Sequence, residues 1–314
     1  MDMLPVDRAV VVTGATAGIG RAVAVRLASR GFRVIGVGRD ERRGAELVTV
    51  LHAVTPSGYA VTHRFLPADL ASMADTARLA DAVSGKTDHL DALVCCAGVF
   101  ALRPEWTEEG FERAFALNYL SRFLLVRRLD TLLRESPSAR IVLVANAGAY
   151  RDRLDLDDPH YRHGRRGLQV AARTQVANDL LAVELAERYR GTSVTATCLL
   201  PGVVRTDVFR HGVGVPRPVA GLLSAVAGLV GLTPDQAAET PSWLAGDADQ
   251  EQLNGSFFGP HRKPRRIPDD ARRPERRQAL WELSEHLTAP WLSGPAPATP
   301  ARGDSGSTSS RTPT

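Results

Sequence analysis

The chain has 314 residues, 44% of them hydrophobic and 24% charged, and carries a formal net charge of +4. This is the composition of a soluble globular protein that can bury a sizeable core. The first residues lack the charged and apolar regions of a secretory signal, and three cysteines are too few for a disulfide framework. We therefore expect a cytoplasmic protein.

Short apolar runs alternate along the chain with longer stretches of helical periodicity. Strands that are apolar throughout suit a parallel sheet buried on both faces, and their alternation with helices implies right-handed βαβ units. The sequence thus predicts one α/β domain over residues 7–293, doubly wound around a mostly parallel, seven-stranded sheet. Residues 294–314 are expected to be a disordered tail. Strands are predicted at 8–12, 32–37, 89–95, 141–145 and 193–199, and helices at 19–30, 41–54, 71–84, 107–135 and 168–190.

One segment without charge stands out late in the chain. Residues 219–232 are fewer than the ~20 apolar residues that are needed to cross a bilayer, so no transmembrane segment is predicted. They suit a core helix, but their place in the chain favours an apolar lid, spanning about residues 208–232, over a ligand pocket. A basic run at 261–277 lacks interleaved aromatic residues, so a solvated surface is expected there and no nucleic-acid partner.

A glycine pattern follows the first predicted strand and opens the first predicted helix. It reads Thr13-Gly14-Ala15-Thr16-Ala17-Gly18-Ile19-Gly20. Gly14 permits a tight turn, Gly18 lets the backbone approach a pyrophosphate, and Gly20 lets helix and strand pack closely. The amino terminus of the helix would then face the negative charge of the phosphates. This context predicts a dinucleotide site.

The residues after the second predicted strand indicate which dinucleotide binds. An acidic side chain there would accept a hydrogen bond from the ribose 2′-hydroxyl and repel a 2′-phosphate, but the chain has Gly38 and Arg39. A guanidinium suits a phosphate, so NADP(H) is expected in preference to NAD(H), with Arg43 as a helper. The following Asp40 is the feature that argues against this preference.

Together these motifs resemble those of the short-chain dehydrogenase/reductase family. The resemblance covers roughly residues 7–290, and within the family the chain looks most like retinol dehydrogenase-like members. It implies a Rossmann-type fold in which Asp69 and Leu70 contact adenine. Ala97 and Gly98 keep the end of the family's Asn-Asn-Ala-Gly motif, and Asn118 stands where the family's Asn supports a proton-relay water.

The same resemblance extends to the nicotinamide and to assembly. The segment Pro201-Gly202-Val203-Val204-Arg205-Thr206 resembles the one that grips the nicotinamide, and Thr206 is placed for its carboxamide. Family members often dimerise through the helices that here span residues 107–135 and 168–190. A homodimer is therefore an expectation from the resemblance.

The residues that the family uses for proton transfer are absent. Family members use a Tyr as the acid, a Lys four residues later to lower its pKa, and a Ser to orient the carbonyl oxygen. No tyrosine of this chain is followed by such a lysine, because the only lysines are Lys86 and Lys263. The resemblance aligns Asn146, Ala171 and Gln175 with Ser, Tyr and Lys. Asn and Gln donate hydrogen bonds but cannot release a proton near neutral pH.

A substitute acid is one open question. Residues 150–167 include Tyr161, which has Arg165 four positions later, and also His160 and His163, which could titrate near neutrality. We take Tyr161 as the candidate, although charged runs of this kind are usually solvated.

Three functions follow from these residues. The first, which we favour, is an atypical oxidoreductase that acts on a small apolar carbonyl compound or alcohol. The second is a non-redox cyclase, dehydratase or isomerase, in which Asn118, Asn146 and Gln175 would hold a polar atom of the ligand. The third is a redox-inactive protein that binds NADP(H).

Overall fold

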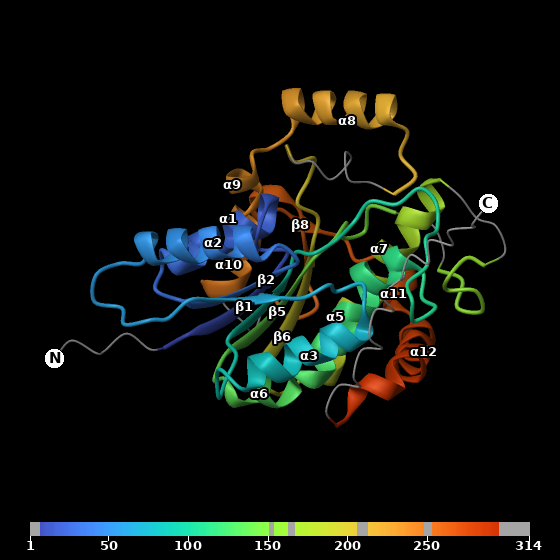
Figure 1. Ribbon diagram of the computed structural model, residues 1–314. Coiled ribbons are helices and arrows are strands. Elements are labelled where there is room, and N and C mark those ends of the chain that lie inside the picture. Colours follow the sequence, from blue (N-terminus) through green and yellow to red (C-terminus); the bar gives the residue numbers. More distant parts are fainter. Residues whose placement is uncertain (1–6, 151–153, 163–166, 206–212, 248–252, 295–314) are drawn as a thin grey trace, which may run out of the picture.

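The computed structural model describes residues 7–150, 154–162, 167–205, 213–247 and 253–294 (Figure 1). The predictions for His163, Arg165 and Thr206 lie outside these ranges, as does nearly all of the expected tail. The described chain forms one mostly parallel sheet with helices on both faces, as predicted. None of the described helices is both long and apolar enough to cross a membrane.

The sheet has eight strands in the order β3-β2-β1-β4-β5-β6-β7-β8. The chain moves from β3 at one edge to β4 on the far side of β1, so the topology reverses between β1 and β4, where doubly wound sheets bind ligands. The strands are β1 (Ala9–Thr13), β2 (Arg33–Gly38), β3 (Arg64–Pro67), β4 (Ala92–Cys95), β5 (Ala139–Val144), β6 (Val194–Leu199), β7 (Phe257–Phe258) and β8 (Pro264–Arg265).

The prediction of seven strands is one short of the observed number. The eighth strand, β8, pairs with β7 in the antiparallel direction, after a short 3₁₀ turn, η2 (Pro260–Arg262). Both strands have only two residues, and Pro264 opens β8 at the edge of the sheet, where no further strand needs its missing N–H. A strand this short, inside a basic run with prolines, has no apolar pattern that could reveal it.

Helices cover both faces of the sheet (Figure 1), and successive residues of a strand point alternately toward one face and the other. Val10 and Val12 of β1 pack on the face under α1, α2 and α10, whereas Val11 packs on the face under α3, α5 and α7. The helices are α1 (Gly18–Ala28), α2 (Glu41–Val54), α3 (Met73–Ser84), α4 (Arg113–Phe115), the π-helix η1 (Ala116–Leu120), α5 (Ser121–Arg128), α6 (Asp130–Glu135), α7 (Leu168–Arg188), α8 (Arg217–Val230), α9 (Pro234–Ala237), α10 (Glu239–Gly246), α11 (Asp269–Arg272) and α12 (Pro274–Leu292).

The last helix, α12, packs across α5 and α7. The Trp281 ring lies edge-on to Phe123 at 4.9 Å between centroids, and the Tyr119 and Ser284 hydroxyls are 2.7 Å apart. These are the helices through which the family resemblance predicts a homodimer. Part of that surface is thus already covered within the chain, and the homodimer stays a prediction.

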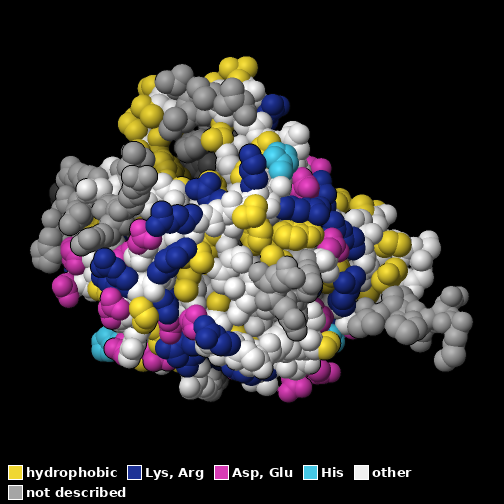
Figure 2. Space-filling view, turned by 180° about the vertical axis from the view of Figure 1, so that it is seen from behind, with side chains coloured by type: hydrophobic (Ala, Val, Ile, Leu, Met, Phe, Trp, Pro, Cys, Tyr) yellow, Lys and Arg dark blue, Asp and Glu magenta, His cyan; other side chains and the backbone are white. Residues whose placement is uncertain are grey.

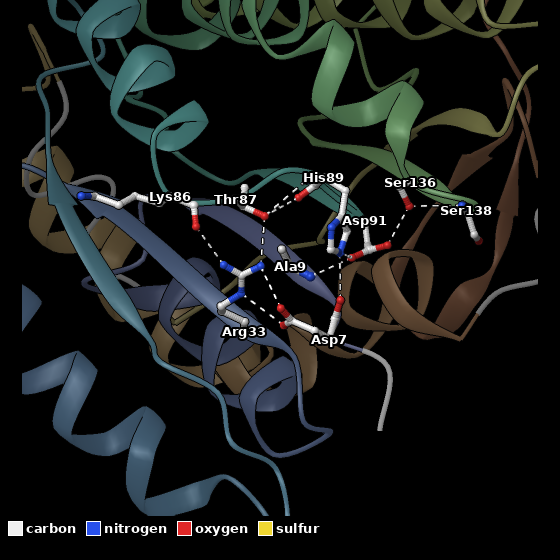
Figure 3. A network of polar contacts seen from close by, with 9 residues as sticks. All are labelled: Asp7, Ala9, Arg33, Lys86, Thr87, His89, Asp91, Ser136 and Ser138. Carbon is white, nitrogen blue, oxygen red and sulfur yellow. Dashed lines mark hydrogen bonds and ion pairs between the residues drawn. The ribbon is translucent and has the colours of Figure 1, made fainter. Parts of the chain in front are cut away.

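A polar network joins the amino ends of β1, β2 and β4, at the edge of the sheet opposite the glycine turn (Figure 3). The buried Asp91 carboxylate accepts hydrogen bonds from the Ala9 N–H at 2.7 Å and the Ser136 hydroxyl at 2.6 Å. Arg33 bonds to Asp7, to the Lys86 carbonyl and to the Thr87 hydroxyl. Backbone and side-chain partners satisfy one another here, so the network stabilises the fold.

Replacing Asp91 by alanine tests this role. Asp91→Ala leaves the buried Ala9 N–H and Ser136 hydroxyl without their acceptor, so we expect the free energy of unfolding to fall by about 1–3 kcal/mol. Urea unfolding measures the loss. The exposed Asp88 is the matched control, and Asp88→Ala should change the stability by less than about 0.5 kcal/mol. Equal losses in the two variants would contradict the assignment.

Candidate functional site

The turn after β1 has no room for a side chain at two positions, Gly14 and Gly20. Gly14 has a φ of +67°, and a Cβ there would lie 3.0 Å from the Ala97 backbone at the end of β4. A Cβ on Gly20 would lie 2.4 Å from the Gly14 carbonyl oxygen. Only glycine fits these two positions, as the sequence predicted from the dinucleotide motif.

The start of α1 is open to an anion. Among the described residues no side chain caps this end of the helix, and its first turn contains no acid. The N–H groups at Gly18, Ile19 and Gly20 are therefore left to a ligand, and the helix dipole favours a negative one. Thr13 closes the other side, because its hydroxyl accepts a hydrogen bond from the Ala97 N–H at 3.0 Å. These groups fit the pyrophosphate of a dinucleotide.

The end of β2 holds an exposed cation. Arg39 follows the strand and has no ion-pair partner in the described part of the chain, while the Thr16 side chain lies against Gly38. Asp40 is engaged elsewhere: it caps α2 by accepting a hydrogen bond from the Arg43 N–H at 3.0 Å, and this bond lowers the pKa of its carboxyl group. The Arg43 guanidinium lies 3.5 Å from the same carboxylate. The acid that argued against a 2′-phosphate thus serves the helix, and Arg43 is paired with it.

Asp69 and Leu70 follow β3 at the same edge of the sheet. The Asp69 carboxylate accepts a hydrogen bond from the Ala71 N–H at 3.0 Å, and Leu70 is buried in the core. Their backbone is anchored to β2, because the Ala68 N–H donates to the Gly38 carbonyl at 2.9 Å. The pair therefore lies beside the strand end that carries Arg39.

We call the glycine turn after β1, the start of α1 and residues 96–98 after β4 the nucleotide cradle. A cavity of about 490 Å³ opens beside it. Its volume is in the range of small-molecule sites. Its lining is largely apolar, with a few polar side chains, and it includes residues of the cradle itself. The lining residues are Ile19, Cys96, Gly98, Val99, Phe100, Asn118, Arg122, Val144, Ala145, Asn146, Ala149, Tyr150, Ala171, Gln175, Leu200, Pro201, Gly202, Val203 and Val204.

The three residues aligned with the family's Ser, Tyr and Lys all line this cavity. Asn146 follows β5, whereas Ala171 and Gln175 lie one turn apart on α7. The Gln175 Nε2 donates to the Thr174 hydroxyl at 3.3 Å, and its Oε1 is buried with no hydrogen-bond partner among the described residues. The cavity thus has amide groups, and the Ala171 methyl, where the resemblance implies the ionisable pair.

Asn118 lies in the π-helix η1 and binds the loop after β4. Its Oδ1 accepts from the Val99 N–H at 2.8 Å, and its Nδ2 donates to the Val99 carbonyl at 2.9 Å. Its own carbonyl accepts from the Asn178 side chain at 2.9 Å. Asn118 therefore shapes the cavity wall, with its side-chain amide engaged by the backbone.

The sequence analysis missed a buried arginine in the cavity wall. Arg122 is 4% exposed and donates to the Ala97 and Val144 carbonyls at 3.0 and 2.9 Å, and to the Asn178 Oδ1 at 3.0 Å. No carboxylate within the described residues pairs with it, and burial lowers its pKa. It ties the ends of β4 and β5 together. The signal in the sequence is an arginine one helical turn after Asn118, at the start of an apolar run.

The tyrosine that the sequence analysis selected does not line the cavity. Tyr161 is 2% exposed, and the guanidinium of the buried Arg173 lies 4.3 Å from its ring centroid. Arg173 also pairs with the buried Glu112. A different tyrosine, Tyr150, lines the cavity together with Asn146; burial raises the pKa of its phenol, and the Asn146 side chain offsets part of the rise.

The segment expected to grip the nicotinamide closes another side of the cavity. Pro201, Gly202 and Val204 line it, and Gly202 has a φ of +82° with room for no Cβ, which would lie 2.9 Å from Pro260. Val204 forms an isolated bridge with Leu232, at the end of α8. Residues of α8 itself are not part of the described lining, and the lid stays a prediction.

Comparisons with known proteins agree with this geometry. A family model described as short chain dehydrogenase matches residues 8–153. Human retinol dehydrogenase 14 is 32% identical over 291 residues, which cover 88% of this chain and 85% of the human protein. Mouse polyprenol dehydrogenase is 35% identical over 287 residues, which cover 90% of this chain and 84% of the mouse protein.

A solved structure supports the same assignment. The crystal structure of an uncharacterized protein from Mycobacterium paratuberculosis matches with a TM-score of 0.66 and 28% identity, over 90% of this chain and 93% of that one. Nearly the whole described domain is thus shared with these relatives, beyond the nucleotide-binding turn alone. The chain belongs to the short-chain dehydrogenase/reductase family.

Proposed function

We propose that the protein is an NADP(H)-dependent oxidoreductase that acts on a small apolar carbonyl compound or alcohol without the family's Tyr–Lys pair. One observation carries the proposal. Ile19, Cys96 and Gly98 of the nucleotide cradle line the same cavity as Asn146 and Gln175. A substrate in this cavity would therefore lie against the nucleotide.

The lining of the cavity supports an apolar substrate. Val99, Phe100, Val144, Leu200 and Val203 supply apolar surface, while the polar groups gather where the ends of β4 and β5 meet α7. Retinol and polyprenol, in the names of the two relatives, are apolar alcohols. A small molecule with an apolar body and one oxygen at its end fits this distribution.

The chemistry divides between the nucleotide and the protein. When bound, NADP(H) supplies or accepts the hydride. Asn146 and Gln175 can hold the reacting oxygen by hydrogen bonds, but an amide does not release a proton near neutral pH. A well-tuned general acid typically contributes about 10²–10⁴ in rate, and this chain has no lysine to lower the pKa of a tyrosine in the cavity, so we expect slow turnover compared with relatives that keep Tyr and Lys.

The nucleotide preference is the first prediction. Arg39 is exposed beside the ribose position and can form two charge-assisted bonds with a 2′-phosphate, at about 1.5–3 kcal/mol each. We expect NADPH to bind at least about tenfold more tightly than NADH in a fluorescence titration, and Arg39→Asp to reverse the order. The exposed Arg42 pairs with Glu46 one turn on, so Arg42→Asp is the control. Equal affinities in the wild type would contradict this prediction.

Restoring the family's residues tests the missing acid. The triple variant Asn146→Ser, Ala171→Tyr and Gln175→Lys should raise NADPH-dependent reduction of apolar aldehydes by about 10² or more. Ala171→Tyr alone should do little, because a phenol without its lysine keeps a pKa near ~10. The gain of the triple variant should thus exceed the sum of the single gains. A wild type that already turns over at about 1–10³ s⁻¹ would show that no acid is missing.

The apolar helix α8 gives a further prediction. Leu229 is 80% exposed, and Figure 2 shows hydrophobic side chains in the upper part of the molecule. If this helix is part of a lid that closes on the ligand, Leu229→Asp should weaken binding of a small apolar alcohol severalfold while leaving the melting temperature nearly unchanged. Unchanged affinity would contradict the lid. Leu229→Ala is the control that keeps the charge constant.

A further inference from the structure

Tyr150 is the phenol that the cavity contains. All five tyrosines of the chain lie in the described ranges, and Tyr150 alone is among the residues that line the cavity. It is half-buried and packs against the main core, in the loop that follows β5. Asn146, in the same loop, occupies the position of the family's Ser. The two lie together with Ala171 and Gln175 around one space.

The loop that carries Tyr150 is held from two sides. The buried Asp179 of α7 accepts hydrogen bonds from the Gly148 N–H at 3.1 and 3.2 Å. Arg265 of β8 donates to the Ala147 carbonyl at 2.8 Å. Both bonds fix the peptide group between Ala147 and Gly148, two residues before Tyr150, and Gly148 itself has a φ of +65°. Tyr150 is thus presented to the cavity by an anchored turn.

Asn146 lines the same cavity wall as the phenol. Its side-chain amide favours the ionised form of Tyr150 and so offsets part of the rise in pKa that burial causes. The phenolic O–H is the group of this tyrosine that can donate a proton to a carbonyl oxygen in the cavity.

We propose that Tyr150 is the proton donor of this enzyme, a catalytic residue supplied by the loop after β5 in place of the family's tyrosine on α7. The inference rests on the proposed function. In the reduction of an aldehyde by NADPH, the carbonyl carbon gains the hydride and the nicotinamide is oxidised. The carbonyl oxygen takes the phenolic proton as the O–H bond of Tyr150 breaks. The phenolate recovers a proton from water at the open side of the cavity.

The surroundings of Tyr150 favour proton donation, as in carbonyl reduction, over proton acceptance. Burial raises the pKa of the phenol, and the Asn146 side chain offsets only part of the rise. The other titratable groups in the lining are Arg122 and Cys96, and burial raises the pKa of the Cys96 thiol to about 12, so it stays neutral. Asp179, which anchors the loop from outside the lining, has its pKa raised by burial to about 7 and is therefore ionised above about pH 8. The phenol therefore remains protonated at neutral pH. It can donate a proton in reduction but cannot accept one in alcohol oxidation.

Two measurements test this role. The first compares single-turnover reduction of a small apolar aldehyde by the wild type, Tyr150→Phe and Tyr161→Phe, each with bound NADPH and an unchanged melting temperature. We expect Tyr150→Phe to lose about 10² or more in rate and Tyr161→Phe to keep the wild-type rate. The second follows the wild type with pH, above the range in which the loop anchor Asp179 ionises. Reduction should stay level from about pH 8 to about pH 9 and fall as the phenol ionises, whereas alcohol oxidation should rise about tenfold per pH unit over the same range.

The outcomes separate this inference from the proposed function. Wild-type turnover that survives in Tyr150→Phe, or a reduction rate that falls between pH 8 and 9, overturns Tyr150 as the donor and leaves the oxidoreductase standing. A wild type that binds NADPH but transfers no hydride to any aldehyde of the panel overturns the proposed function, and Tyr150 as its donor with it. Loss of rate in both tyrosine variants points to packing and also contradicts the assignment.

Discussion

The turn after β1 packs so closely against the end of β4 that it has no room for side chains. The parallel register aligns Thr13 with Val37 of β2 and with Cys95 of β4, so the three strands end at one level. The glycines of the turn let α1 begin directly above that level, with unsatisfied N–H groups facing outward. Every other feature of the site depends on this contact. It fixes where a pyrophosphate can lie, and thereby where the nicotinamide meets the cavity.

Because the contact is made by backbone atoms, it is independent of the residues farther along β5 and α7. The motifs of the nucleotide half resemble the family's, and the same resemblance assigns Asn146, Ala171 and Gln175 to the positions of the proton-transfer residues. The two halves still meet in one cavity. Arg122 contributes to this by bonding the carbonyls at the ends of β4 and β5. The residues of proton transfer after β5 and on α7 can therefore change while the nucleotide site stays the same.

Much of the fold could be predicted from the sequence, since the central strands are apolar runs that are buried on both faces. The predicted strand at 8–12 is shifted by one residue from β1, and the one at 193–199 begins one residue before β6. The strands at and next to the edges of the sheet could not be found in this way. β3 reads Arg64-Phe65-Leu66-Pro67, with exposed ends, and β7 and β8 have two residues each. Their pairing depends on neighbours that are distant in the sequence.

Some residues of the site could likewise be predicted from the sequence, and others could not. Motif residues such as Gly14 and Gly20 could be predicted, because their spacing reflects a local turn. The positions of Asn146, Ala171 and Gln175 followed from the family register, and all three line the cavity. The choice between two tyrosines could not be made from sequence. Tyr161 and Tyr150 lie in the same charged segment, and only the packing of Arg173 over Tyr161 and the place of Tyr150 in the cavity lining distinguish them.

The central claim is that an intact nucleotide cradle opens onto a cavity whose usual acid is missing. A crystal structure of the protein soaked with NADPH tests it most directly. The account predicts the 2′-phosphate against Arg39, the pyrophosphate over the start of α1, and the nicotinamide C4 facing the space between Asn146, Tyr150 and Ala171. Nucleotide density elsewhere on the molecule, or a nicotinamide ring walled off from that space, would contradict it.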